Sequence, residues 1–370
     1  MHKISVFYLI IALLFIVSGR AVAELPTGTQ VLFLPPGNNN PRNSEGDFVT
    51  LKDGRVLFVY SHYTGTSSSD HASAYLAGRF SDDGGKTWSK EDTTIVENEG
   101  KMNVMSVSLL RLQNGTIALF YLRKNSLTDC IPMVRISTDE AKTWSEPIPC
   151  ITDKTGYFVL NNNRVIQLEN GRLLLAVALH ENREEKFNAH GKLFSYYSDD
   201  NGVSWHCSKE VPNSSGVIAQ EPGVIELKDG TIMMFIRASG GVQQLSFSQD
   251  KGQTWSPMLA STIQSPLSPA SIARIPSTND LLLVWNNNDG SAAPQTIGRR
   301  TPLTIAVSKD EGKTWEHITD IETDPKGWYC YIAIHFAEND VLLSYCSGPP
   351  QFNPLTATSV LQLRQEDLYR

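Results

Sequence analysis

The chain has 370 residues, with 32 Lys and Arg against 39 Asp and Glu, and its formal net charge is −7. A mildly acidic chain without a basic block lacks the positive surface that binds phosphate backbones, so a nucleic-acid partner is not expected. Five cysteines in so long a chain do not form a disulfide framework, although Cys130 with Cys150, or Cys330 with Cys346, could pair in an oxidising compartment.

The N-terminus has the pattern of a secretory signal. Lys3 is followed by an apolar run over residues 4–17 and by small residues that end at Ala23. This pattern predicts a signal peptide over residues 1–23 and a secreted or periplasmic protein, with a retained N-terminal anchor as the alternative. No other segment is long and apolar enough to cross a bilayer, so no membrane span is expected after cleavage.

Six tight-turn dipeptides interrupt apolar or alternating runs along the rest of the chain. The dipeptides are Asp53-Gly54, Asn114-Gly115, Asn170-Gly171, Asp229-Gly230, Asn279-Asp280 and Asn339-Asp340. Asn-Gly and Asp-Gly supply the positive φ angles of a two-residue hairpin loop, so each dipeptide predicts a β-hairpin.

A second repeat, Ser-x-Asp-x-Gly-x-Thr-Trp or a close variant, alternates with the hairpins. Its copies begin at Ser81, Ser137, Ser198, Ser248 and Ser308. In each copy the Asp accepts hydrogen bonds within a tight turn, Gly takes the left-handed conformation and Trp packs beneath the turn. These boxes are therefore interpreted as structural, and Ala141, which replaces Gly in the second copy, predicts a strained turn.

The two repeats together define one four-stranded unit: hairpin, strand, box, strand. Six such units predict an all-β protein, a six-bladed β-propeller with four-stranded antiparallel blades over residues 24–370, whose last blade lacks a box. We expect the apolar segments at residues 30–34 and 359–363 to pair and close the ring, because an open ring leaves strand edges unpaired.

The repeat register also predicts a ring of polar side chains. Eight residues before the first turn residue of each hairpin stand Glu45, Ser106, Asn162, Glu221, Ser271 and Tyr331. The first strand of each blade lies nearest the axis, so these positions should surround one mouth of the central channel. Connections alternate between the two faces, which places this ring on the face away from the boxes.

Charged residues converge on the same predicted face. Arg42 stands at the start of a first strand, Arg237 at the end of a second strand, and Asp70 and Arg300 in loops between second and third strands. Arginine forks bind a planar carboxylate through two hydrogen bonds, and neighbouring acids are typical of glycoside chemistry.

At this point the sequence resembles the sialidase superfamily over nearly the whole of residues 24–370. The segment QEPGVIELKDGTIMMFIR is similar to the sialidase segment that carries a Glu and an Arg, here Glu221 and Arg237. RRTPLTIAVSKDEGKTW resembles the segment with the third arginine, Arg300. GWYCYIAI resembles the segment with the nucleophilic tyrosine, Tyr331, and Tyr329 is the alternative.

Two further residues match less closely. Arg42 matches the first arginine of the family and Asp70 its acid/base aspartate. The usual Ile-Pro after the first arginine is absent, and Glu45 and Asp47 stand nearby instead, adding carboxylates near the expected sugar. Arg164 adds a further polar group on the same face. We expect Glu45, Asp47 and Arg164 to bind substrate with the three arginines.

The resemblance implies a secreted, exo-acting retaining glycoside hydrolase that releases terminal sialic acid from glycoconjugates. Glu221 would activate Tyr331 as the nucleophile, and Asp70 would act as acid and base. It implies a glycan substrate, no metal, no organic cofactor and a monomer. Two alternatives remain open: an exo-glycosidase for another acidic or neutral terminal sugar, and a non-catalytic carbohydrate-binding propeller.

Overall fold

The structure is a computed structural model that describes residues 28–182, 186–290, 300–348 and 355–370. The predicted signal peptide lies outside these residues. Almost all regular structure is antiparallel β-sheet, as predicted, and one short 3₁₀ helix, η1 (Gln365–Tyr369), follows the last strand. Within the described residues, no helix has the length and hydropathy needed to span a membrane.

Three of the four-stranded sheets are built from consecutive strands. The first contains β2 (Asn43–Thr50), β3 (Val56–Tyr63), β4 (Ala74–Ser81) and β5 (Thr93–Val96). Another contains β15 (Ala219–Glu226), β16 (Ile232–Ala238), β17 (Val242–Ser248) and β18 (Leu259–Gln264). A third contains β19 (Ser271–Arg274), β20 (Leu281–Trp285), β21 (Leu303–Ser308) and β22 (Glu316–Glu322).

A nine-stranded sheet lies between the first and second of these in the chain. One half contains β6 (Asn103–Arg111), β7 (Ile117–Ser126), β8 (Asp129–Ser137) and β9 (Ile148–Pro149). The other contains β10 (Tyr157–Val159), β11 (Val165–Gln167), β12 (Leu173–His180), β13 (Lys192–Ser198) and β14 (His206–Cys207). The halves are joined where β10 pairs in parallel with β8 through Tyr157 and Cys130.

The last four-stranded sheet combines both ends of the described chain. It contains β23 (Tyr329–Ala337), β24 (Asp340–Ser347), β25 (Thr358–Arg364) and β1 (Thr29–Leu34). β1 pairs antiparallel with β25, for example through Phe33 and Ser359. The predicted pairing of the two terminal segments is therefore confirmed.

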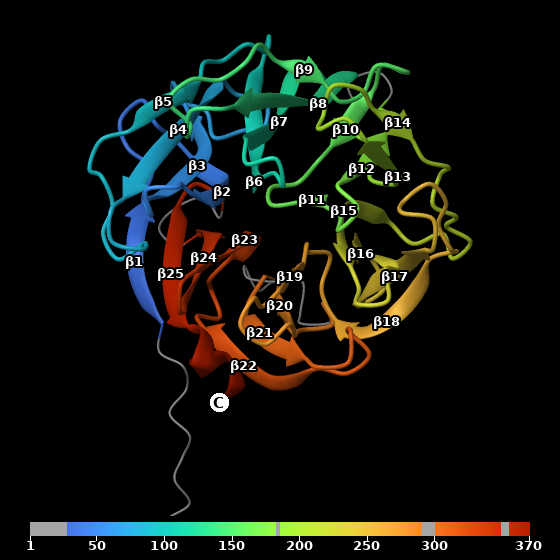
Figure 1. Cartoon of the computed structure of the whole chain (residues 1–370). Coiled ribbons are helices and arrows are strands. Elements are labelled where there is room, and N and C mark those ends of the chain that lie inside the picture. Colours follow the sequence, from blue (N-terminus) through green and yellow to red (C-terminus); the bar gives the residue numbers. More distant parts are fainter. Residues whose placement is uncertain (1–27, 183–185, 291–299, 349–354) are drawn as a thin grey trace, which may run out of the picture.

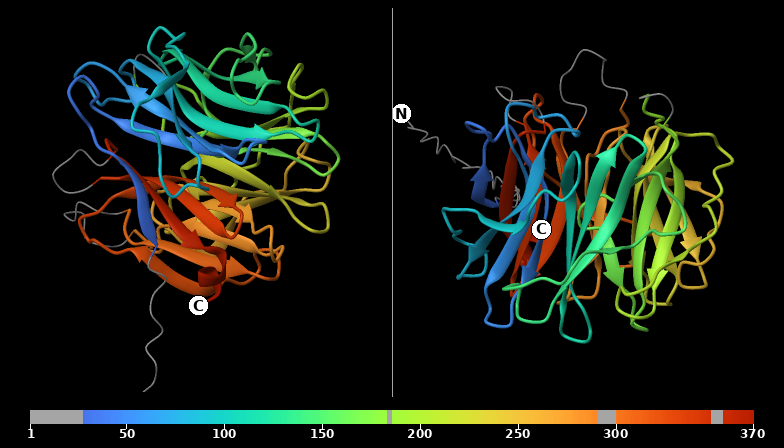
Figure 2. Two further views of the ribbon diagram at one scale, coloured as in Figure 1. Left: turned by 60° about the vertical axis from the view of Figure 1, so that its left-hand side comes forward. Right: turned by 90° about the horizontal axis from the view of Figure 1, so that it is seen from above.

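The sheets are arranged around a central axis, with β2, β6, β11, β15, β19 and β23 nearest the centre (Figure 1). The strands run between the two faces of this ring (Figure 2). Apolar side chains fill the space between neighbouring sheets. Val49 and Leu57 of one sheet, for instance, share a buried cluster with Val104 and Leu119 of the next.

The boxes connect the third and fourth strands, as predicted. In the first box, Ser81 donates to Asp83 (2.8 Å), and Asp83 accepts from the backbone N–H of Thr87 (2.8 Å). The Trp88 indole N–H donates to the Gly85 carbonyl (3.0 Å). Ala141 adopts a φ of 62°, in the left-handed region that a residue with a Cβ adopts at a cost.

The hairpins are found where the dipeptides predicted them, but the prediction of a two-residue loop is wrong for most of them. In the first hairpin the Leu51 N–H donates to the Arg55 carbonyl and the Gly54 N–H donates to the Leu51 carbonyl, which encloses three residues. Gly54 has a φ of 88°, and Asp53 does not have a positive φ. This is a type I turn followed by a left-handed glycine, in which only the glycine needs the positive φ.

Candidate active site

The innermost strands carry a repeated backbone irregularity at the predicted ring positions. At or next to these positions, five residues other than glycine adopt a positive φ: Glu45 (57°), Ser106 (60°), Asn163 (55°), Glu221 (42°) and Tyr331 (57°). The register shifts between Ser44 and Asp47, and equivalent shifts occur in β6, β15 and β23. A β-bulge re-aims a side chain at a cost in backbone energy, and such strain concentrates at functional sites.

Two predicted ring positions differ from this pattern. In the third unit the positive φ falls on Asn163, one residue after the predicted Asn162. Ser271 adopts no positive φ. Both predicted side chains nevertheless contact the inner strand β23: Asn162 donates to the Tyr331 carbonyl (3.1 Å), and the Ser271 hydroxyl donates to the Ile332 carbonyl (2.7 Å).

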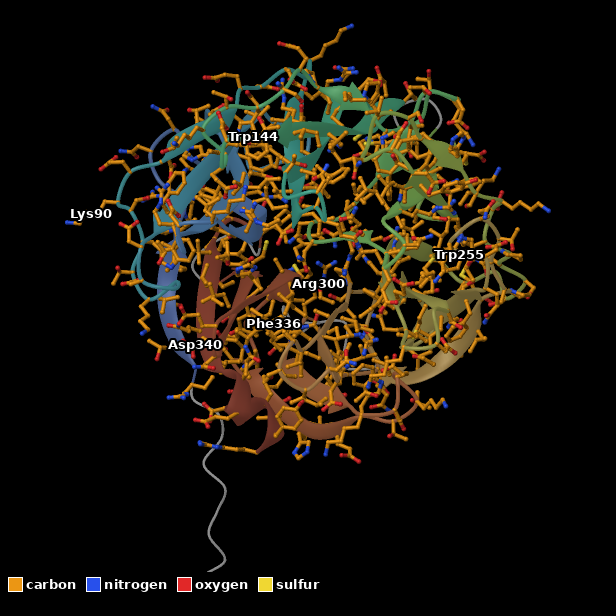
Figure 3. All side chains as sticks on the ribbon, viewed as in Figure 1. Lys90, Trp144, Trp255, Arg300, Phe336 and Asp340 are labelled. Atoms are coloured by element: carbon orange, nitrogen blue, oxygen red, sulfur yellow. The ribbon has the colours of Figure 1, made fainter. Side chains whose placement is uncertain are left out.

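A cavity of about 280 Å³ opens where these strands meet. Its charged lining comes from Glu45, Asp70, Lys124, Glu221 and Arg237, and Tyr331 is one of several further polar residues that line it. A second cavity of about 360 Å³ shares Arg237 and Leu267 with the first and is also lined by Arg300 and Trp328. Arg300 lies near the centre of the ring (Figure 3).

A larger hollow, of about 530 Å³, lies elsewhere and is mainly apolar. Its lining combines the Asp229 hairpin with the last box. Two of its charged side chains, Lys228 and Glu311, pair with each other. We therefore place the candidate chemistry in the two smaller cavities, whose polar groups converge.

Tyr331 and Glu221 face each other in the first cavity. The Tyr331 hydroxyl donates to Glu221 Oε1 at 3.4 Å, and Arg237 Nη1 pairs with the same oxygen at 2.7 Å. Glu221 Oε2 is buried without a hydrogen-bond partner. Burial and the charge of Glu221 raise the pKa of the Tyr331 hydroxyl, against the opposing effect of Arg300, so the phenol is neutral at physiological pH.

Arg300 provides a buried cation beside the phenol. Its guanidinium carbon lies 5.4 Å from the centre of the Tyr331 ring and 5.1 Å from that of Trp328. Arg300 Nη1 is buried and has no hydrogen-bond partner. Arg237 and Arg300 are therefore the two predicted arginines that line the cavities.

Arg42 occupies a different position from the other two arginines. It is 1% exposed and lines neither cavity. Its Nη2 pairs with Glu45 (2.9 Å), its Nη1 pairs with Asp70, and its guanidinium stacks on Tyr63 at 4.6 Å. Arg42 therefore pairs with two carboxylates that line the first cavity, while its own side chain does not line it.

The two carboxylates held by Arg42 have opposite pKa shifts. Burial, opposed by Arg42, raises the pKa of Glu45. For Asp70, burial acts in the same direction, but Arg42 outweighs it and the pKa is lowered. Ser106 donates a short hydrogen bond to Glu45, which fixes that carboxylate further. The pair thus presents an enclosed acid and a half-exposed carboxylate to the same cavity.

The structure does not bring Asp47 and Arg164 to either cavity. Asp47 accepts hydrogen bonds from the Phe48 N–H (2.7 Å), the Leu109 N–H (2.8 Å) and the Asn163 amide (2.9 Å). The bulge at Glu45 breaks the alternation that would place both acids on one side of β2.

Arg164 makes its contacts within the packing between the inner strands. Its guanidinium donates to Ser271 (3.3 Å) and to the Ala270 carbonyl, and it stacks on Phe235 at 5.1 Å. Burial lowers its pKa to about 10. Its side chain is surrounded by these partners, which accounts for its absence from the cavity lining.

Sequence reasoning missed Lys124, which lines the first cavity. Lys124 lies in β7 two residues after Leu122, and alternate residues of a strand share one side. The sequence feature that could have identified Lys124 is a lysine in an apolar strand, at a position whose alternation with Leu122 predicts burial. Among the described residues, no group of three or more His, Cys, Asp or Glu side chains is arranged to hold a metal ion.

A family profile of BNR repeat-like domains matches residues 63–343. The chain is 28% identical to a sialidase of Clostridium perfringens over 234 residues, which are 55% of this chain and 58% of that protein. It is 26% identical to a sialidase of Bacteroides fragilis over 304 residues, which are 72% of this chain and 53% of that protein. The chain thus spans about half the length of these curated relatives.

Solved structures share the fold. A Hadza microbial sialidase superposes with a TM-score of 0.72 at 19% identity, covering 92% of this chain and 68% of that one. A protein of unknown function from Dyadobacter fermentans gives 0.71 at 22% identity, covering 92% and 100%. The chain belongs to the BNR repeat-like domain family, and its similarity to curated sialidases confirms the predicted resemblance.

Proposed function

We propose that this protein is an exo-acting glycoside hydrolase of the sialidase type, which releases terminal sialic acid from glycoconjugates with retention of configuration. The observation that carries the proposal is the 3.4 Å contact between the Tyr331 hydroxyl and Glu221 in a cavity that also contains Arg237. The curated relatives named sialidases support it.

The proposed mechanism uses a neutral nucleophile because the substrate carries a carboxylate on its anomeric carbon, where an anionic carboxylate would be repelled. Glu221 accepts the phenolic proton as Tyr331 attacks the anomeric carbon. Arg237 pairs with Glu221 and, with Arg300, binds the substrate carboxylate. Because the pKa of Asp70 is lowered in the free protein, Asp70 first takes up a proton. It then protonates the leaving oxygen and afterwards activates the water that releases the sugar from Tyr331.

Arg42 takes a positioning role in this proposal. Its two Nη atoms pair with Glu45 and Asp70, so it orients the acid/base carboxylate. Its low exposure supports this role over direct binding of the substrate carboxylate.

The same proposal includes the architecture and the location of the protein. Reading each half of the nine-stranded sheet as one unit gives six units, the number expected for a six-bladed propeller over residues 24–370. A single bridge between Tyr157 and Cys130 joins the halves, which supports treating them separately. We also propose that the protein is secreted or periplasmic and acts as a monomer.

The test compares Tyr331→Phe with Tyr329→Phe in an assay of a fluorogenic α-sialoside. Tyr329 is the alternative nucleophile, is buried, and bonds to Glu322 outside the cavities. We expect the Tyr331 variant to lose turnover by about 10²- to 10⁴-fold, the contribution of a positioned catalytic group, and the Tyr329 variant to keep most of it. Turnover of the Tyr331 variant close to that of the wild type would refute the assignment.

A second candidate is an exo-glycosidase for a different acidic sugar. The observation that favours it is the engagement of Arg42 by Glu45 and Asp70, which leaves two arginines at the cavities. Release assays with uronic-acid and arabinosyl glycosides beside the sialoside distinguish the two candidates. Hydrolysis of a uronic-acid glycoside without release of sialic acid would select the second.

A further inference from the structure

Lys124 is an enclosed cation at the first cavity. Its side chain is 2% exposed, and its ammonium donates to the Asp70 carbonyl at 2.8 Å. Its other neighbours are weak acceptors: Met105 Sδ at 3.3 Å and the ring of Tyr157, whose centre lies 5.4 Å away. An ammonium has three N–H donors and no acceptor, so one strong hydrogen bond leaves it under-satisfied.

No carboxylate of the described residues forms an ion pair with Lys124, although three carboxylates line the same cavity. Glu45 and Asp70 are held by Arg42, and Glu221 is held by Arg237. A buried charge is costly unless a counter-charge or hydrogen bonds compensate it. Lys124 therefore presents a positive charge that forms no ion pair with a carboxylate of the described residues, although its charge contributes to the lowered pKa of Asp70.

Arg300 is in the same situation in the adjoining cavity. It makes no ion pair with the described residues, and its Nη1 has no hydrogen-bond partner. Arg237 and Leu267 line both cavities. The two adjoining cavities thus contain two positions where an anionic group of a ligand would find a cation that forms no ion pair with the described residues.

We propose that the ligand carries two separate anionic groups. One, the sugar carboxylate, binds Arg237 and Arg300, and a second carboxylate or sulfate binds the ammonium of Lys124. This inference rests on the proposed function and narrows its substrate class to dianionic acidic glycans. The apolar lining beside Lys124, including Met105, Leu122 and Val159, excludes water and strengthens the attraction.

The test compares kcat/KM for three matched α-sialosides: one without a second charge, one with a sulfate ester on the sugar, and an α-2,8-linked disialoside. We expect the wild-type protein to prefer at least one dianionic substrate by about tenfold, the effect of one charge-assisted hydrogen bond. The sulfated and disialyl substrates distinguish a sulfate from a second carboxylate. If the wild-type protein has equal kcat/KM for all three substrates, the proposal is overturned, and no variant is needed to show this.

Lys124→Met and the control Lys90→Met each remove one positive charge, and Lys90 is exposed at the outer edge of the ring (Figure 3). We expect the dianion-to-monoanion ratio to fall to about 1 in the Lys124 variant and to persist in the control. A Lys124 variant that loses activity equally on all substrates would assign the residue a purely structural role. Lys124→Gln provides a second test if the methionine variant fails to fold.

Direct binding separates this inference from the proposed function. Titration calorimetry of the wild-type protein with sialic acid and with its sulfate ester measures the preference without catalysis. If no sialoside is hydrolysed, the proposed function fails, while a tenfold tighter binding of the sulfate ester still supports the second anion position. Equal affinity for the two sugars would contradict that position.

Discussion

Glu45 and Asp47 illustrate how one backbone irregularity assigns different roles to similar residues. A regular strand would place both acids on one side, but the bulge aims Glu45 at the cavity and leaves Asp47 among backbone donors. Burial outweighs hydrogen bonds from Leu109, Phe48 and Asn163 and raises the pKa of Asp47 to about 7. Asp47 therefore contributes to the pH dependence of stability.

A raised pKa means that the folded protein holds the Asp47 proton more tightly than the unfolded chain does. The resulting stabilisation is complete below the unfolded pKa near 3.8 and is lost as the pH rises through about 7. Asp47→Asn, which mimics the protonated acid, should flatten the fall in unfolding free energy between about pH 4 and 7. Urea denaturation across this range measures it.

The exposed hairpin carboxylate of Asp53 offers a control for this experiment, because its pKa is lowered and it titrates below the window. We expect Asp53→Asn to leave the slope between pH 4 and 7 as in the wild type. We also expect Asp47→Asn to leave KM unchanged. A higher KM in that variant would return Asp47 to the substrate-binding role that its sequence position suggested.

The central side chains were predictable where a repeat supplied a register. Counting back from each hairpin located Glu45, Ser106, Glu221 and Tyr331, all of which adopt positive φ. The pairing of Arg42 with Glu45 and Asp70 was not predictable. The repeat register places a residue at one mouth of the central channel, but it does not show which side chains that residue contacts. Lys124 was missed because its strand reads as a core strand.

At the scale of elements, the box of one sheet is tied to the hairpin of its neighbour. Glu311 of the last box accepts from the Lys228 N–H at 2.8 Å and pairs with Arg274 at 2.8 Å. Glu140 of the second box does the same with the Lys52 N–H (2.8 Å) and with Arg111 (2.6 Å). Boxes and hairpins thus share one face of the ring, which agrees with the predicted alternation of faces.

Glu311→Gln tests how much this tie stabilises the fold. Although burial opposes ionisation, the bonds from Arg274 and the Lys228 N–H lower the pKa of Glu311 to about 2. The stabilisation is present above the unfolded pKa of 4.5 and is lost as the pH falls toward 2. We expect the variant to lose about 1–2 kcal/mol of unfolding free energy at neutral pH.

The loss in Glu311→Gln should shrink between about pH 4.5 and 2, as measured by chemical denaturation. Glu316→Gln is the matched control, because Glu316 is exposed and its contact with Lys309 is longer, at 3.3 Å. Exposed pairs contribute little to stability, so the control should change by less than about 0.5 kcal/mol. Equal effects of the two substitutions would argue against a structural tie at Glu311.

The turn dipeptides located the hairpins but not their loop lengths. Asp-Gly is compatible with a two-residue loop or with a three-residue loop whose glycine is left-handed, and the twist of the flanking strands selects between them. Gly54 adopts the second solution. In the sixth hairpin Ala337 pairs with Asp340, so that loop does have two residues, Glu338 and Asn339.

At the scale of the whole molecule, the ring arrangement was the most predictable feature, because a regular repeat spacing indicates similar units placed side by side. The third unit is where the prediction was least complete. Its inner segment is split into β10 and β11, and β10 contacts the preceding unit through Cys130. The sequence over residues 160–164 was not recognised as a turn, so the division of this segment into β10 and β11 was not predicted.

Removal of β1 tests the contribution of the sheet that joins both ends. A chain beginning at residue 35 exposes the edge of β25 and loses Leu34, which is 6% exposed. We expect its unfolding free energy to fall by at least about 2–5 kcal/mol, the loss associated with one buried leucine, and its tendency to aggregate to rise. Calorimetry and light scattering measure both effects.

A chain that begins at residue 28 retains β1 and provides the control for that deletion. We expect its unfolding midpoint to stay close to that of the full chain. Identical midpoints for the two truncated chains would show that the pairing of β1 with β25 contributes nothing measurable.

The pairing of β1 with β25 also sets an order of events during synthesis. β1 leaves the ribosome first, yet its hydrogen-bonding partner is encoded more than 300 residues later. Earlier sheets have all their strands available before translation ends, whereas this one must wait for the last residues of the chain. A nascent polypeptide therefore carries an unmatched strand for almost its entire elongation, and a premature stop before residue 358 leaves that strand permanently without its neighbour.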